Sequence, residues 1–291
     1  MKTEEKRKLQ ELGGSLYLSV PSQWTGRFGL KKGSELLISM EESGEIMIFP
    51  EKEDEKTEKT AAFEYDRFFF RNLIRNYLFG TDLIRIKKSK PFTESERKEI
   101  ASKVNILLNL EIIEEDSKTI TIQNLKSDIP IKKMISRMHF LTKGMMEDLA
   151  RGSKDEEVLK SIIDRDRLVG KLYLAVIMQQ RALLTSKWSK ELSFVEILDL
   201  RLLIQKIEQI GDEIKSIAAK TLRGEKKRIS EDGLQFLASR YEDAFNAYIR
   251  QDAGCAKRFW DTERSDRKRL SADEDLVRVY DNIKDISDLV I

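Results

Sequence analysis

The stretch ILDLRLLIQKIEQIGDEIKSIAA, residues 197–219, decides the fold class of most of this chain. Its apolar side chains recur at alternating spacings of three and four residues, at Leu200, Leu203, Ile207, Ile210, Ile214 and Ile217. Such a spacing places them on one face of an α-helix, as the seam of a left-handed helical bundle. The stretch therefore predicts a long helix that packs antiparallel to its neighbours.

The helical pattern extends over nearly all of the chain beyond Pro130. Polar breaks interrupt it at RGSKDEE (151–157), KWSKELS (187–193), RGEKKRISEDG (223–233), RQDAG (250–254) and RLSADED (269–275). They predict about six helices. The stretches EQIGD and DNIKD, at residues 208–212 and 281–285, form a faint internal repeat. We therefore expect two three-helix units in tandem over residues 127–291.

The first fifty residues carry a different, β-type pattern. Leu16, Leu18 and Val20 alternate with polar residues, which predicts a half-buried strand, and Pro21 suits the first turn of a short helix through Phe28. Two apolar strands at 36–40 and 45–49 are expected to form a hairpin. A module this small buries such strands poorly alone, so pairing with a second copy is expected.

Between these regions the sequence predicts a linker and a mixed segment. Residues 51–60, EKEDEKTEKT, are polar and charged, and place a boundary near residue 55. Residues 61–126 are expected to be α+β. The predicted elements are a helix at 61–77, a strand at 82–88, a helix at 93–108 with a Thr cap, and strands at 110–115 and 119–123.

Composition limits the functional classes. The 291 residues include 53 basic and 51 acidic side chains, so net charge alone indicates no partner. Cys255 is the sole cysteine, which excludes an internal disulfide and a cysteine-based zinc site. No apolar run approaches the roughly 20 residues that cross a bilayer, so a soluble cytoplasmic protein is expected. His139, the one histidine, lies among apolar residues, and no catalytic set can be built around it.

Two parts of the sequence resemble known families. Residues 5–50, with SLYLSVPSQW and GLKKGSEL, resemble the AbrB-type swapped-hairpin domain, here taken as residues 1–52. KIEQIGDEIKSIA and, more weakly, VYDNIKDISDLVI resemble PhoU, the phosphate uptake regulator family. The segment from RNYLFGTDLIRI to ISRMHFL is similar to archaeal proteins that join these two modules. The expected architecture is mainly α, with a swapped-hairpin β domain, an α+β middle segment and two three-helix bundles.

The resemblance implies a DNA-binding regulator of phosphate uptake that is dimeric through its front module. DNA phosphates would be contacted by the cations of that module: Lys6, Arg7, Lys8, Arg27, Lys31 and Lys32. The alternative interpretation is that these cations are ordinary solvated surface, since Glu4, Glu5 and Glu11 dilute the first cluster. The alternative function is an adaptor that binds no DNA and docks on a phosphate transporter or its signalling partner.

PhoU relatives also carry metal clusters, which are held by pairs of acidic residues spaced four residues apart. The resemblance therefore implies that carboxylate pairs of this chain hold divalent or iron-type metal ions. The spacing places two carboxylates one helical turn apart, where they can share a hard cation. Glu208 with Asp212 fits the pattern, and Asp281 with Asp285 fits it with Asp in place of Glu.

The partner helices fit the metal pattern less well. The first supplies Asp166 but has Gly170 where a second acid is expected, and the other supplies Glu263 but has Arg267 there. A guanidinium cannot ligate a metal. The alternative interpretation is that these acids are solvated carboxylates on exposed helix faces.

Overall fold

A computed structural model describes residues 5–40, 44–50, 58–125, 129–185, 192–226 and 230–290. The chain divides into two compact units, Met1–Thr57 and Glu58–Ile291, which are described separately below as the front unit and the main unit. In the part of the chain that is described, no helix is long and apolar enough to cross a membrane.

The front unit consists of two hairpins and one short helix. β1 (Gln10–Leu12) pairs antiparallel with β2 (Ser15–Tyr17), and β3 (Leu36–Met40) pairs antiparallel with β4 (Ile46–Pro50). The predicted β3–β4 hairpin is confirmed, although Ser43 at its tip lies outside the described residues. β1 was not predicted, and β2 ends before Leu18. Gly13 and Gly14, with φ of 60° and 79°, form the two-residue turn that joins β1 to β2.

The helix α1 (Ser22–Phe28) begins after Pro21, as predicted, and ends at Gly29. Gly29 has φ of 63°, a left-handed conformation that glycine adopts without steric cost. Trp24 packs edge-on against Phe28 within this helix, with ring centroids 5.7 Å apart.

A single front unit leaves its apolar side chains uncovered. Leu16 is 68% exposed, Ile38 60% and Met40 78%. Its helix buries no residue, and Pro50 is the one buried residue among the described residues of the unit. One copy of the front unit therefore lacks a core of its own.

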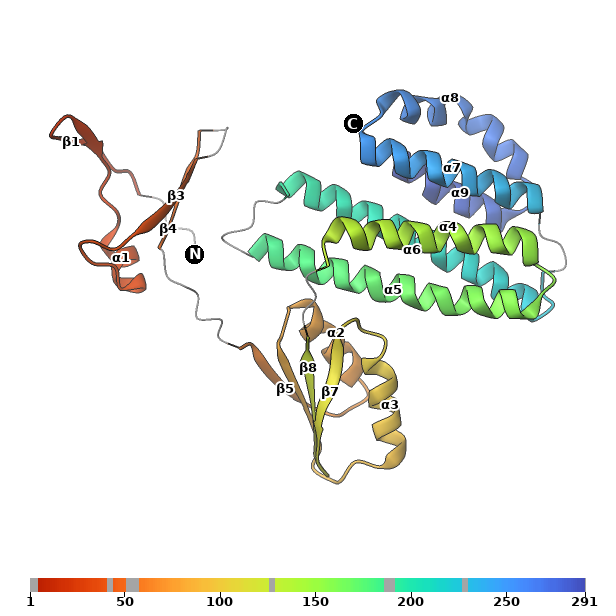
Figure 1. Ribbon diagram of the computed structural model, residues 1–291, viewed down its shortest axis with the longest axis horizontal. Helices are drawn as coiled ribbons and strands as arrows, with labels where there is room; N and C mark the ends of the chain where they lie inside the picture. Colours follow the sequence, from red (N-terminus) through yellow and green to blue (C-terminus); the bar gives the residue numbers. More distant parts are fainter. Residues whose placement is uncertain are drawn as a thin grey trace. The chain divides into compact units, whose positions relative to one another are not determined.

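The main unit begins with a four-stranded sheet and two helices (Figure 1). The elements in chain order are β5 (Thr60–Glu64), α2 (Phe69–Leu78), β6 (Leu83–Lys87), α3 (Glu94–Val104), β7 (Leu110–Glu115) and β8 (Thr119–Asn124). The sheet order is β5-β6-β8-β7, with β5 parallel to β6 and the other pairs antiparallel. The predicted helix at 61–77 is wrong in its first part, because residues 60–64 form a strand.

The two helices cover one face of this sheet. Leu73 and Tyr77 from α2, and Ile100 from α3, pack on Ile84 and Ile122 in a shared core. The predicted cap of α3 is confirmed: the Glu96 amide donates to the Thr93 hydroxyl, and the Thr93 amide donates to the Glu96 carboxylate. This box satisfies two backbone donors at the helix start.

Six helices follow, as predicted, in the described part of residues 131–290. They are α4 (Ile131–Gly152), α5 (Glu156–Thr185), α6 (Phe194–Leu222), α7 (Glu231–Arg250), α8 (Ala253–Leu270) and α9 (Glu274–Ser287). The α6 seam is confirmed, since each of its six predicted positions is buried. Ser193 and Glu196 cap its start reciprocally.

One hydrophobic core runs through all six helices. α4 packs on α7, and α6 packs on α9, so the two three-helix units are joined side by side. His139 on α4 stacks on Phe245 of α7, with ring centroids 3.8 Å apart, and is a packed residue as expected. Trp260 of α8 is 52% exposed and donates from Nε1 to Asp288 at 2.8 Å. Trp188 lies outside the described residues.

Candidate functional site

The first acidic set joins α5 and α6. Asp166 of α5 is 9% exposed, and its carboxylate accepts a hydrogen bond from the Lys215 ammonium at 2.7 Å. Lys215 also pairs with Asp212 on its own helix. Glu208 lies half-buried beside Asp212. The structure thus brings three of the predicted acids together, and it places an ammonium among them.

Close helix packing positions this set. A Cβ at Gly211 would lie 3.4 Å from the Asp166 carboxylate and 3.8 Å from the Thr142 hydroxyl of α4. Because glycine lacks that atom, α6 approaches Asp166 directly. Asp166 is thereby held in the interior, where a carboxylate requires a cationic or hydrogen-bonding partner.

The proximity of the carboxylates shifts their protonation. Burial, followed by the charges of Asp212 and Asp166, raises the pKa of Glu208 to about 7. Burial also raises the pKa of Asp166 above its usual range, although the bond from Lys215 opposes this shift. Burial opposes the charge of Lys215, yet its bonds to Asp166 and Asp212 raise its pKa above the usual value. The set titrates close to neutral pH through Glu208.

The second acidic set joins α8 and α9 and has the same character. Arg267 lies 3.2 Å from Asp281 and 3.7 Å from Glu263. Lys284 approaches Glu263 at 3.9 Å, and Asp285 pairs with Lys206 of α6 at 2.6 Å. Every predicted acid of this set therefore has a basic side chain of the chain itself as its partner.

These two sets do not fit a multinuclear metal centre as they stand. Among the described residues, no three His, Cys, Asp or Glu side chains are arranged to hold a metal ion. Lys215 and Arg267 supply the positive charge that such an ion would bring. Sequence reasoning missed Lys215, although its position three residues after Asp212 places it on the same helix face. It therefore competes with any cation for the same carboxylates.

The six predicted DNA-binding cations all lie in the front unit and are exposed. Arg7 pairs with Glu5, and the Arg27 guanidinium lies 5.6 Å from the ring centroid of Phe28. Over residues 5–50 the six cations are balanced by six acidic residues. A DNA-binding face would thus depend on how two copies group these charges.

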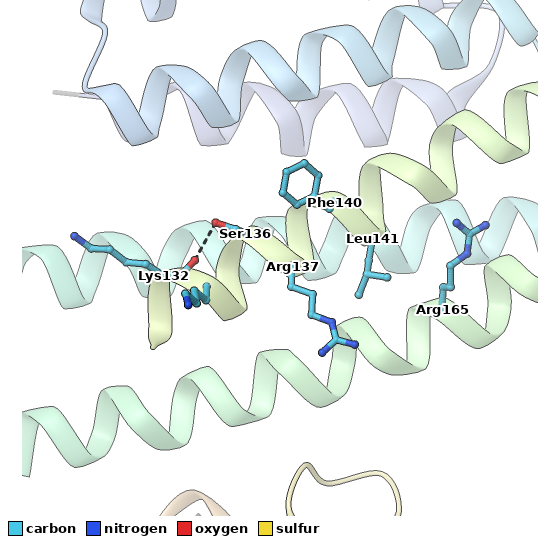
Figure 2. A pocket seen from close by; sticks show the side chains of 7 residues that line it. Lys132, Ser136, Arg137, Phe140, Leu141 and Arg165 are labelled. Atoms are coloured by element: carbon cyan, nitrogen blue, oxygen red, sulfur yellow. Dashed lines mark hydrogen bonds between the residues drawn. The ribbon is translucent and has the colours of Figure 1, made fainter. Parts of the chain in front are cut away.

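A basic and aromatic surface lies on α4, over a groove of 510 Å³. Figure 2 shows Arg137 and Phe140 extending in different directions from the exposed face of the helix, with Lys132 toward its start. Phe140 is 68% exposed, and Lys132, Lys133 and Arg137 make no ion pair within the described chain. We call these four residues the α4 surface. Its members diverge, a geometry that suits a broad partner better than a small molecule.

An apolar strip occupies the first half of α6. Its side chains are exposed by 47–72% and comprise Phe194, Val195, Leu198 and Leu202. α9 packs against α6 beyond this strip, where Lys206 and Lys220 pair with Asp285 and Asp275. The sequence carries a signal for this strip, because its apolar residues lie outside the spacing of the buried seam of α6.

One region of the chain matches a known protein family. Residues 135–221 match the PhoU domain, and they cover most of α4, all of α5 and nearly all of α6. Among solved structures, the crystal structure of PhoU from Pseudomonas aeruginosa is similar, with a TM-score of 0.47 and 16% sequence identity. That match covers 55% of this chain and 93% of the other. No curated protein matches the chain. The expectation of a PhoU-like helical region is confirmed.

Proposed function

We propose that this chain is a PhoU-like regulator of phosphate uptake that works as an adaptor rather than as an enzyme. Its helical region would dock on a protein partner, either the cytoplasmic part of a phosphate transporter or the transporter's signalling partner. The observation that carries the proposal is the match of residues 135–221 to the PhoU domain. PhoU domains are associated with control of phosphate uptake, and this match spans the main-unit segment that carries α4, α5 and α6.

The α4 surface supplies the docking chemistry for this role. Three exposed cations lie on the same helix as one exposed phenyl ring, and none of them forms a close ion pair among the described residues. An acidic partner segment with an apolar side chain would complement both features, since charge guides association and a buried aromatic ring anchors it. The surface also lies within the matched region apart from Lys132 and Lys133, which immediately precede it.

The proposal is tested by binding of the full chain to the purified cytoplasmic subunit of a phosphate transporter from the same cell. Reversing the charges of Lys132, Lys133 and Arg137 to Glu should weaken binding at least about ten-fold, mostly through slower association. The matched control reverses the exposed Lys257, Arg258 and Arg264 of α8, and alters net charge equally. Equal weakening in both variants would show that only net charge matters and would overturn the α4 assignment.

DNA binding by a dimer of the front unit is the second candidate. The observation in its favour is the uncovered apolar surface of a single front unit, which a second copy would bury, together with six exposed cations. Dimerisation would gather both sets of cations into one molecule, where they could neutralise DNA phosphates. The even charge balance of residues 5–50 counts in favour of the adaptor instead.

The DNA candidate is tested by fluorescence anisotropy with the chain's own upstream DNA at several salt concentrations. Binding by a front-unit dimer should weaken steeply with salt, and Lys31→Glu with Lys32→Glu should abolish it. An Ile38→Asp variant separates the two steps, because it places a charge on the surface that a dimer would bury. If the unmodified chain dimerises but binds no DNA, the front unit serves for dimerisation alone.

A further inference from the structure

Among the residues that the structure describes, the strand β5 is an unpaired edge of the main-unit sheet. It pairs with β6 on one side, and in Figure 1 it forms the outer strand. A groove of 370 Å³ runs beside it, lined on the strand side by Ala61, Ala62 and Phe63. The other wall comes from α2 and comprises Asn72, Arg75, Asn76 and Phe79. An added strand would lie along this edge.

The outward-facing backbone groups of β5 can be assigned from its pairing with β6. The Lys59 carbonyl accepts from Asp82 and Leu83, and the Tyr65 amide donates to the Lys87 carbonyl. In a parallel pair, alternate residues direct both their N–H and C=O groups to the same neighbour. Residues 59, 61, 63 and 65 therefore face β6, whereas Thr60, Ala62 and Glu64 direct theirs away from the sheet.

The two edges of the sheet differ in how they are protected. β7, the opposite edge, carries Glu111, Glu114 and Glu115, and its pairing is irregular between Ile112 and Glu114. Charges and bulges are the devices that prevent an edge strand from pairing with another chain. β5 has the sequence TAAFE, with one charge, no proline and regular register throughout. It lacks the protection that β7 has.

We propose that β5 pairs antiparallel with β5 of a second copy, centred on Ala62, and forms one continuous eight-stranded sheet. Ala62 then exchanges both of its hydrogen bonds with Ala62 of the second copy, as its outward backbone groups require. Thr60 lies opposite Glu64, and Ala61 opposite Phe63. Two-fold symmetry makes each contact on either side of the central Ala62 pair occur twice.

The side chains fit this register. The single charged residue of the strand, Glu64, faces Thr60 rather than the second Glu64, so no like charges stand opposite. The small side chains at the centre allow close approach of the two backbones. Phe63 of the second copy would lie on the helix-covered side, where the groove has room and Phe79 is 60% exposed.

This contact is separate from the front-unit dimer proposed above and does not rest on it. Nine residues separate Pro50 from Thr60, and they reach at most about 30 Å when extended. If the front units also pair, that tether raises the effective concentration of the two β5 edges. Each of the two contacts can form or fail without the other.

Disulfide trapping in the full-length chain tests the register. Cys255→Ser first removes the one natural cysteine. Ala62→Cys would then place two cysteines with Cα atoms about 5.5 Å apart, within the roughly 4.4–6.8 Å that disulfides span. Glu64→Cys, on the same strand and face, would place its two cysteines about 14 Å apart, beyond reach.

Mild oxidation should yield covalent dimer from Ala62→Cys in excess over Glu64→Cys by on the order of ten-fold. Equal yields from both would mean that the two strands meet without a fixed register, and would overturn the pairing. No dimer from either would overturn it as well. Because Ile38→Asp reports on the front-unit dimer by itself, failure of one contact is not confused with failure of the other.

Hydrogen exchange supplies an independent readout. Proline at position 62 removes an outward N–H and leaves the β5–β6 bonds intact, and edge strands tolerate such a residue. In the unmodified chain the amides of Thr60 and Glu64 should be protected, and Ala62→Pro should remove that protection. Ala62→Val is the matched control and should retain it. Fast exchange in the unmodified chain, or unchanged protection with proline, would overturn the proposal.

Discussion

The Lys215 ammonium lies 2.7 Å from the Asp166 carboxylate and also pairs with Asp212, so one cation holds two acids from different helices. Asp166 is 9% exposed, and α5 and α6 pack closely around it. The Lys215 ammonium thus supplies the positive charge that a bound metal ion could otherwise supply to these carboxylates.

Removal of Lys215 should destabilise the main unit. Lys215→Met leaves Asp166 buried with other carboxylates nearby and no cation, a cost of about 2 kcal/mol, reduced from the value of a fully buried pair because Lys215 is partly exposed. Urea unfolding at pH 8 measures the loss. The loss should shrink as the pH falls, because burial raises the pKa of Asp166 above its usual range and its protonation removes the unpaired buried charge. A loss that does not depend on pH would contradict this mechanism.

Glu208 should make stability depend on pH in the direction opposite to a salt-bridged acid. Its pKa rises from 4.5 to about 7 in the folded chain, so its ionisation costs stability progressively as pH rises from 4.5 to 7. Glu208→Gln should therefore stabilise the chain by on the order of 1 kcal/mol at pH 8 and change little at pH 4. Urea titrations at both values measure the difference. Glu111→Gln, at an exposed position of β7, is the matched control variant.

A divalent cation should compete with Lys215 for the first acidic set. Calorimetric titration with Mn²⁺ should show binding to Lys215→Met that is tighter than binding to the unmodified chain by on the order of ten-fold, because the competing ammonium is gone. Glu208→Ala with Asp212→Ala in the same background should abolish that binding. Equal affinity in the first two proteins would remove the metal assignment from Asp166, Glu208 and Asp212.

Asp266 should be the most costly acid to remove from the second three-helix unit. It is 9% exposed, accepts from Thr262 at 3.0 Å and Tyr280 at 3.2 Å, and pairs with Arg240. Asp266→Ala leaves the Arg240 guanidinium unpaired in a largely buried position, at a cost of about 3 kcal/mol. Urea unfolding against the exposed Asp261→Ala tests this. A similar loss in both variants would contradict the role of the network.

The sequence predicts those elements whose stabilising contacts join residues close together in the chain. The α6 seam is visible because its three-and-four spacing lies within one helix, and Thr93 with Glu96 is visible because the cap spans three residues. β5 was missed because Ala61, Ala62 and Phe63 have no strand signature of their own. Pairing with β6, some twenty residues away, makes them a strand.

The candidate site shows the same division between local and distant contacts. Glu208 and Asp212 could be paired from their spacing, whereas the bond between Asp166 and Lys215 joins residues 49 positions apart. The sequence shows Arg267 in place of an acid, but its contact with Asp281 depends on how α8 folds back on α9. The α4 surface has a signal in the helical spacing of Lys133, Arg137 and Phe140, which share one broad face.

The continuous core of α4 to α9 has a consequence for cooperativity. His139 on the fourth helix stacks on Phe245 of the seventh, and α6 lies against α9, so the internal repeat does not delimit independent parts. Neither half can melt without exposing apolar surface of the other to water. The six helices therefore constitute one calorimetric unit, and a ligand that binds anywhere on them stabilises every helix by the same free energy.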